Sequence, residues 1–229
     1  SISEAIRQVL LDEGLAADKV SCVRSAVDPT PFLAPVDPSA FRAEFRLPQD
    51  ALVIGMVAQM IPRKGHRYLF SALPGLVERY PELQVLVFGQ GPLLGELRSD
   101  VAARGLDSVV HFTGFRHDLA SWIGGLDMLA HPAEMEGLGV SLLQAAAAGV
   151  PVITSRAGGL PEAVQDGVTG ILCPPGDVDA LAAAIDRLAG DPALRRQYGE
   201  AGRQRILAEF SIGRMVDGNL ALYHQVLGR

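Results

Sequence analysis

The sequence predicts an α/β fold in which a doubly wound parallel sheet is followed by C-terminal helices. Short runs rich in valine, isoleucine and leucine recur along the chain and alternate with amphipathic segments. The runs are apolar throughout, which is typical of parallel strands that are covered on both faces. After residue 173 the strand-like runs stop, and only helical patterns follow.

The expected elements follow one another without an internal repeat or a convincing linker. We expect strands at residues 20–27, 52–58, 83–88, 109–112, 127–131, 150–154 and 170–173. Helices are expected at residues 1–14, 65–80, 93–104, 119–124, 140–148, 178–189, 192–210 and 212–227. Pro192 and Ser211 stand where a helix begins, as a first-turn proline and a capping serine. The sequence therefore predicts one domain over residues 1–229, with a helical part at residues 174–229.

Composition excludes several classes of protein. Of the 229 residues, 48% are hydrophobic and 20% charged, which excludes a disordered chain. The net charge is −6 with both signs interleaved, so the concentrated basic face of a nucleic-acid-binding protein is missing. One basic stretch is interpreted as a solvated helix face, with peripheral contact to an anionic membrane as the alternative; it contains Arg195, Arg196, Arg203, Arg205 and Arg214.

The two cysteines, Cys22 and Cys173, lie in apolar runs and belong to no metal-binding motif. We expect buried, reduced thiols and a reducing compartment. No signal peptide is recognised, and we expect the cytoplasm, at the inner face of the membrane if the basic stretch makes that contact. The uncharged run 137–155 is broken by Gly149 and Pro151, which favours a buried helix leading into a buried strand over a membrane span.

Functional residues should lie where strands end, because open parallel sheets bind ligands outside the carboxyl ends of their strands. Gln59, Arg63 and Lys64 follow the strand at 52–58, and Gly89 and Gly91 follow the strand at 83–88. Further along the chain, the residues after such strand ends are Phe115, Arg116, Glu136 and the run from Gly137 to Gly139. The glycines and polar groups therefore gather on one edge of the sheet.

Gly137, Leu138 and Gly139 precede a helix, so their backbone N–H groups can face an anion or a sugar. A tight strand-to-helix turn explains the same glycines equally well. Lys64 is one of only two lysines beside eighteen arginines, which mildly indicates a phosphate contact against an ordinary surface lysine. Glu136 and Gln144 can both face the crevice and bind sugar and ribose hydroxyls, although this spacing alone is a weak signal.

Other chemistries are disfavoured. The Gly89-Gln90-Gly91 turn has Leu94 where a dinucleotide fingerprint needs its third glycine. The five histidines are scattered without metal-ligand spacing, so no metal is expected. His131, at a strand end near Glu136, is interpreted as a packed residue, with pocket lining as the alternative. The sequence has no GxSxG elbow, which disfavours a serine hydrolase.

Taken together, five segments in order resemble the C-terminal lobe of retaining glycosyltransferases of family four (group one), which have two facing Rossmann-like lobes, the GT-B fold. They are residues 55–65, 89–92 and 112–115, the E-x7-E-like region 132–151, and the Gly158-Gly159-Leu160-Pro161-Glu162 run. The resemblance covers nearly the whole chain. It places residues 1–18 near the crossing between the lobes and implies that an acceptor-binding N-terminal lobe is absent from this chain.

The resemblance implies a nucleotide diphosphate sugar as the donor substrate and hexosyl transfer without a metal or other cofactor. Lys64 is then expected to neutralise the diphosphate, and Glu136 to contact the donor sugar beside the Gly137–Gly139 amides. Gln144 is expected to hold the ribose hydroxyls, while Phe115 and Arg116 border the base. Gln59, Arg63 and Gly91 complete the expected donor site, and the isolated lobe is expected to be inactive.

The sequence departs from the family at two site positions. Gln59 stands where an arginine is usual, so a phosphate-binding cation is missing unless Arg63 replaces it. Gln144 stands at the second glutamate of the E-x7-E pair, and its amide offers one carbonyl in place of a carboxylate. Two alternatives therefore stay open: a degenerate sugar-nucleotide-binding scaffold without turnover, and, more remotely, a sugar-nucleotide epimerase.

Overall fold

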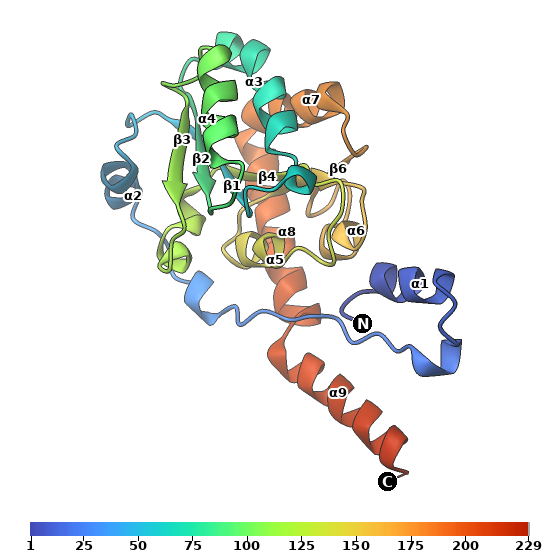
Figure 1. Cartoon of the computed structure of the whole chain (residues 1–229). Coiled ribbons are helices and arrows are strands. Elements are labelled where there is room, and N and C mark those ends of the chain that lie inside the picture. The colour runs from blue at the N-terminus through green and yellow to red at the C-terminus, as the bar shows by residue number, and fades with distance from the viewer. Residues whose placement is uncertain (229) are drawn as a thin grey trace.

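A six-stranded parallel sheet lies at the centre of the computed structural model, which describes residues 1–228 (Figure 1). Its order is β3-β2-β1-β4-β5-β6, and each neighbouring pair is parallel. The strands are β1 Leu52–Val57, β2 Leu83–Phe88, β3 Val110–Gly114, β4 Met128–His131, β5 Val152–Ser155 and β6 Gly170–Cys173. This is the Rossmann order, with its switch point between β1 and β4, so the predicted fold class is confirmed.

Alternate side chains along each strand enter two separate cores. In β1, Val53 packs into the core on one face, whereas Ile54 and Met56 pack into the core on the other. β2 follows the same alternation, with Phe88 in the first core and Val87 in the second. Both faces are therefore buried, which explains why the strands are apolar throughout.

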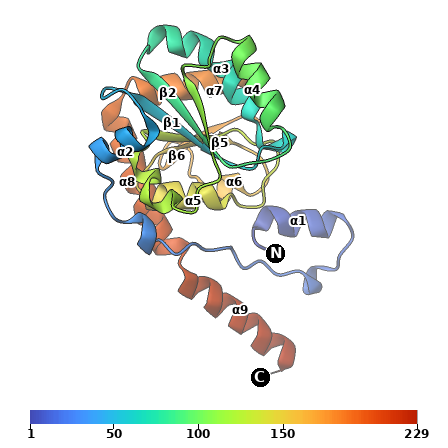
Figure 2. The same ribbon diagram turned by 60° about the vertical axis from the view of Figure 1, so that its left-hand side comes forward.

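Helices cover both faces of the sheet (Figure 2). α3 His66–Arg79, α4 Leu94–Ala103 and α7 Val178–Ala189 pack on one face. α2 Pro38–Phe45, α5 Val140–Ala147 and α6 Leu160–Ala163 pack on the other. α8 Pro192–Glu209 supplies residues to both cores, because Tyr198 belongs to one and Ile206 to the other.

The first and last helices lie outside this body (Figure 1). α1 Glu4–Asp12 lies beside α6, and α9 Ile212–Leu227 extends away from the sheet. Five short 3-10 helices complete the described residues: η1 Ala17–Lys19, η2 Thr30–Phe32, η3 Pro62–Lys64, η4 Leu119–Ser121 and η5 Ile123–Gly125. No helix within residues 1–228 is long and apolar enough to cross a membrane.

The strand predicted at residues 20–27 is wrong. This segment is extended but joins no sheet, because its backbone bonds to the first residues of the chain and to the turn after α8 instead. Val23 N–H donates to Ser1 O at 3.0 Å, and Val27 N–H donates to Phe210 O at 3.2 Å. Val20 and Val27 are nevertheless buried, so the segment has the apolar pattern of a strand although it joins no sheet.

The helix predicted at residues 119–124 is also wrong, because η4 and η5 occupy this stretch. Gly125 ends the second turn, and a Cβ there would lie 2.4 Å from the ring of Phe41. Close packing of Phe41 thus requires a glycine, which disfavours a longer helix. α2, which carries Phe41, and the short α6 were not predicted, although Asp37 and Pro38 provide a cap and a first-turn proline for α2.

Three arginines of the basic stretch do not form a solvated helix face. Arg203 donates to Ala147 O at 3.1 Å and to Ala148 O at 2.7 Å, at the end of α5. Arg195 bonds the carbonyls of Leu188 and Ala189 at the end of α7 in the same way. Arg205 binds the last turn of α6. These half-buried arginines satisfy helix C-termini, whose carbonyls lack partners and carry negative charge.

The two cysteines differ in exposure. Cys173 is buried in β6, as expected, and burial raises the pKa of its thiol to about 11, with Asp166 and Asp177 adding to the shift. Cys22 is only half-buried, because it lies in the extended segment outside the sheet. The expectation of two buried thiols therefore holds for Cys173 alone.

Candidate functional site

The loops after β1 and β4 are joined at the carboxyl edge of the sheet. Arg63 O accepts a hydrogen bond from Glu134 N–H at 2.9 Å, and Arg63 Nη1 donates to Met135 O at 3.4 Å. Gly65 then turns the chain into α3 with φ 77°, and a Cβ there would lie 1.9 Å from Pro132 O. A glycine is required on both counts, and it allows the preceding Lys64 to lie against the β4 loop.

Lys64 and Glu136 form an ion pair between these two loops. Lys64 Nζ donates to Glu136 Oε2, and the two side chains are only 11% and 16% exposed. His131, at the end of β4 and 1% exposed, places Nε2 3.4 Å from the same oxygen. The carboxylate therefore has a cation and an imidazole on one oxygen, and both contacts favour its ionised form.

The surroundings of Glu136 keep it ionised. Burial alone acts to raise its pKa, but hydrogen bonds from His131 and Lys64, together with the charge of Lys64, outweigh burial. They lower the pKa of Glu136 from 4.5 to about 2. The side chain is therefore an anion with hydrogen-bond-accepting oxygens over the whole physiological pH range.

His66, the first residue of α3, lies beside this pair. It is 2% exposed, and within residues 1–228 neither ring nitrogen has a hydrogen-bond partner. Burial, together with the smaller effects of His131 and Lys64, lowers the pKa of His66 from 6.5 to about 4. His66 is thus a neutral ring at neutral pH. The scattered histidines of the sequence therefore include two that the fold brings to the Lys64–Glu136 pair.

Gly137, Leu138 and Gly139 lead from Glu136 into α5. Gly139 has φ 82° and stands at the N-cap, so the helix begins without a side-chain cap. In the described part of the chain, the N–H groups of residues 138–141 donate no hydrogen bond, whereas Gly137 N–H bonds Glu136 Oε1 at 3.2 Å. The side chain of Leu138 is 1% exposed within the core, so only its backbone is available to a ligand.

A cavity of about 280 Å³ opens beside the β1 loop and contains several predicted residues. Gln59, Phe115 and Arg116 all line it, together with Gly89 and Gln90. Phe115 is 58% exposed there, as a stacking platform would be. Arg116 is already engaged, because its guanidinium donates to Asp118 at 2.6 Å and 2.7 Å and lies 2.7 Å from Glu44.

Two predicted residues lie apart from this cavity. Gly91 packs on the backbone of Met60, and a Cβ there would lie 2.5 Å from Met60 O, so its role in the structure is close packing. Gln144 is half-buried on α5, in the second turn after Gly139.

A second cavity, of about 320 Å³, lies beside Gly65, His66 and Glu134. The loop that carries Lys64 thus borders both cavities.

The described residues contain no group of three or more histidine, cysteine, aspartate or glutamate side chains arranged to hold a metal ion. Lys64 and Glu136, together with the free N–H groups before α5, lie at this edge. Cations and amide donors of this kind can bind a phosphate, and a carboxylate beside them can bind hydroxyl groups.

Sheet order and site position define a Rossmann-like α/β domain with a charged site at its switch edge. The chain belongs to the family Glycosyl transferases group 1, whose pattern matches residues 38–205. The recognised resemblance is therefore confirmed, and the fold is that of one lobe of GT-B enzymes.

Individual glycosyltransferases are also similar to this chain in sequence. A 2-deoxystreptamine glucosyltransferase of Streptomyces kanamyceticus is 33% identical over 234 residues, covering 100% of this chain and 60% of that protein. A D-inositol 3-phosphate glycosyltransferase of Kribbella flavida is 36% identical over 199 residues, covering 82% of this chain and 47% of that protein. The chain spans between 43% and 60% of the length of the curated relatives that it matches.

Solved structures show the same fold. The crystal structure of Anabaena HepE in complex with UDP and glucose superposes with a TM-score of 0.89 at 24% identity, covering 100% of this chain and 62% of that one. The C-terminal domain of a group 1 glycosyltransferase from Francisella tularensis superposes with a TM-score of 0.73 at 27% identity. That comparison covers 81% of this chain and 99% of the Francisella domain.

Proposed function

We propose that this chain binds a nucleotide diphosphate sugar and forms the donor lobe of a retaining hexosyltransferase. The observation that carries the proposal is the Lys64–Glu136 pair, which lies between two hydrogen-bonded loops at the carboxyl edge of the sheet. Family membership and the solved relative with UDP and glucose support it. The acceptor is then held by a partner lobe, because transfer requires it across the cleft from the donor.

In this proposal each part of the edge binds one part of the donor. Lys64 and the free N–H groups before α5 bind the diphosphate and stabilise the negative charge that grows on it during transfer. Glu136 accepts hydrogen bonds from the sugar, and Gln144 binds the ribose. Phe115 stacks on the base in the cavity that Gln59 also lines. Arg63, exposed beside Lys64, supplies the second phosphate-binding cation in place of Gln59.

These residues also provide charge stabilisation without a metal ion. A lysine and the N-terminus of a helix can together neutralise a diphosphate, so the proposed transfer needs no cofactor.

Substitution of the two lysines tests the phosphate assignment. Lys64→Ala is expected to weaken binding of a nucleoside diphosphate by roughly 10- to 100-fold, because a charge-assisted hydrogen bond contributes about 1.5–3 kcal/mol. Lys19→Ala is the matched control, since Lys19 is the other lysine and is exposed in η1. Titration calorimetry with UDP, GDP and ADP and their sugars measures both variants. Unchanged affinity in Lys64→Ala contradicts the assignment.

The scaffold alternative rests on Gln59, which is exposed, and on Gln144. The two hypotheses differ in turnover. If the full two-lobed protein transfers or hydrolyses a sugar nucleotide as it stands, the scaffold hypothesis is rejected. If only a Gln59→Arg, Gln144→Glu variant does so, the natural chain is a binding module. Product analysis without an acceptor separates an epimerase from both.

A further inference from the structure

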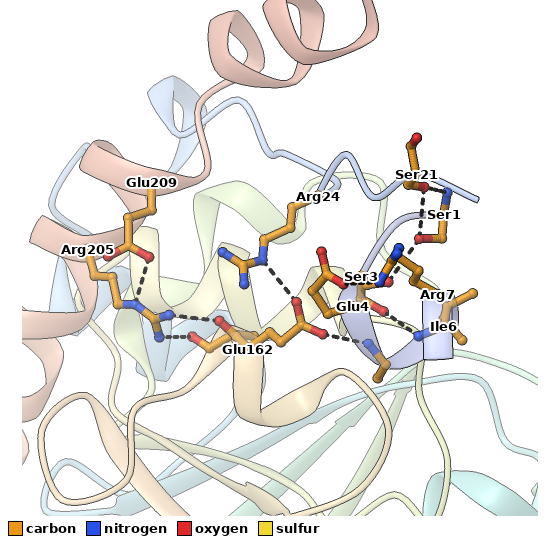
Figure 3. A network of polar contacts seen from close by, with 12 residues as sticks. Ser1, Ser3, Glu4, Ile6, Arg7, Ser21, Arg24, Glu162, Arg205 and Glu209 are labelled. Atoms are coloured by element: carbon orange, nitrogen blue, oxygen red, sulfur yellow. Dashed lines mark hydrogen bonds and ion pairs between the residues drawn. The ribbon is translucent and has the colours of Figure 1, made fainter. Parts of the chain in front are cut away.

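Glu162 joins α6 to the N-terminal helix through both of its carboxylate oxygens (Figure 3). Oε1 accepts a hydrogen bond from Ala5 N–H in the first turn of α1 at 3.0 Å, and Oε2 accepts one from Arg24 Nε at 2.9 Å. The side chain is 15% exposed. An anion beside a helix N-terminus and an arginine is held by two favourable charge interactions.

The main chain of Glu162 is held from the opposite side (Figure 3). Arg205 of α8 donates to Glu162 O at 2.9 Å and to Ala163 O at 3.2 Å, and its Nε contacts Glu209. Burial acts to raise the pKa of Glu162, but hydrogen bonds from the α1 backbone and from Arg24 outweigh it and lower the pKa. Three segments distant in sequence therefore meet at Glu162: α1 and Arg24 at its carboxylate, and α8 at its main chain.

The turn that precedes α6 also contacts the loop that carries Glu136. Gly159 N–H donates to Glu136 O at 3.0 Å. A Cβ on Gly159 would lie 1.9 Å from Gly137 O and 3.0 Å from Ser3 Oγ, and a Cβ on Gly137 would lie 2.9 Å from Ile2. Ser3 is fully buried in this contact. Residues 136–137 therefore lie between the Gly159 turn and the start of α1, with close contacts to both.

We propose that Glu162 is a positioning residue: by tying α1 and Arg24 to α6, it holds the main chain of Glu136 and Gly137 in the conformation that meets the donor sugar. This rests on the proposed function, since Glu136 is assigned there to the sugar. Glu162 touches no donor group itself, and it acts through the Gly158–Gly159 turn. The contact between α1, Glu162 and the Gly159 turn is called the α1–α6 contact below.

The test compares Glu162→Ala and Glu162→Gln with Asp186→Asn in the full chain. Asp186 is the matched control, because it also pairs with an arginine, Arg79, 3.0 Å away near the C-terminal ends of α7 and α3. Hydrogen exchange is expected to accelerate roughly tenfold or more in residues 4–7 and at Gly159, whose N–H donates to Glu136 O, in Glu162→Ala. Glu162→Gln keeps a carbonyl acceptor for Ala5 and should restore part of the protection.

Ligand binding then separates positioning from a general loss of structure. Glu162→Ala is expected to weaken the sugar nucleotide that wild type binds best by about 5- to 10-fold, while affinity for the corresponding nucleoside diphosphate stays within about twofold. Equal weakening of both ligands, or unchanged exchange at Gly159, overturns the proposal. A wild-type chain that binds neither ligand overturns the proposed function instead, and the exchange experiment alone then decides whether Glu162 orders this loop.

Discussion

Replacement of Glu136 by glutamine tests whether the carboxylate is stabilised as the structure indicates. Glutamine has nearly the same shape, but it cannot form the ion pair with Lys64, and it leaves that lysine without its anion. The shift of the Glu136 pKa from 4.5 to about 2 corresponds to roughly 3 kcal/mol of stabilisation of the folded chain. We expect Glu136→Gln to lower the free energy of unfolding by about 2–3 kcal/mol at pH 7.

The pH dependence gives this prediction its sign. Because the folded-state pKa of Glu136 is depressed, its stabilisation is fully present above pH 4.5 and is lost as the pH falls towards 2. The difference between wild type and Glu136→Gln should therefore shrink to less than half of its neutral value by about pH 3. The difference shrinks because the unfolded chain protonates this carboxyl first, and only below the folded-state pKa of about 2 is Glu136 itself protonated and nearly equivalent to glutamine.

Urea titrations followed by far-UV circular dichroism at pH 7, 5, 4 and 3 measure both curves. The change at low pH is read as a difference between the two proteins, so acid sensitivity of other carboxylates cancels. A difference below about 1 kcal/mol at pH 7, or one that stays constant down to pH 3, refutes the reasoning.

Two further predictions concern packing and thiol chemistry. Gly159→Ala should lower the free energy of unfolding in urea by more than about 2 kcal/mol, because its Cβ would lie 1.9 Å from Gly137 O. Gly95→Ala is the control, since nothing lies within 4 Å of its Cβ position in α4, and it should raise stability by up to about 1 kcal/mol; equal effects contradict the packing argument. A thiol reagent at pH 8 should label half-buried Cys22 roughly tenfold or more faster than Cys173, whose pKa is raised to about 11. Faster labelling of Cys173, identified by peptide mapping, contradicts this prediction.

The parallel strands could be predicted from sequence because their signal is local. A strand buried on both faces needs apolar side chains throughout, and β2 and β6 begin and end at the predicted residues. The run at residues 20–27 carries a similar pattern for a different reason. Its partners are Ser1, the first residue, and Phe210, which follows α8, and no local pattern reports such distant bonds.

The arginines show a second limit of the sequence. A helix with alternating charges favours a solvated face, yet Arg203 and Arg205 each reach the last carbonyls of a neighbouring helix. A solvated arginine and an arginine that binds a neighbouring helix end have the same type and spacing in the sequence. The difference depends on how α8 crosses α5 and α6, which is a property of the packed molecule.

The position of the site could be predicted better than its interactions. Lys64 and Glu136 are 72 residues apart, and the rule that carboxyl ends of parallel strands share an edge places both correctly. That rule does not predict that Lys64 and Glu136 pair directly or that His131 contacts the Glu136 carboxylate. Nor does it predict the hydrogen bond from Ala5 to Glu162. Such contacts depend on side-chain directions and on loops whose conformation is set by glycines at 65, 137 and 159.

The ion pair has a consequence for ligand selectivity. If Lys64 binds the diphosphate as proposed, the ligand competes there with the carboxylate of Glu136, which already pairs with this lysine. A nucleotide sugar offers its sugar hydroxyl groups as hydrogen-bond donors to the displaced Glu136 carboxylate. A nucleoside diphosphate without a sugar leaves that carboxylate with fewer hydrogen-bond donors. The ion pair would then favour binding of the nucleotide sugar over binding of the nucleoside diphosphate product, and it would ease release of that product. Only the two side chains would need to move.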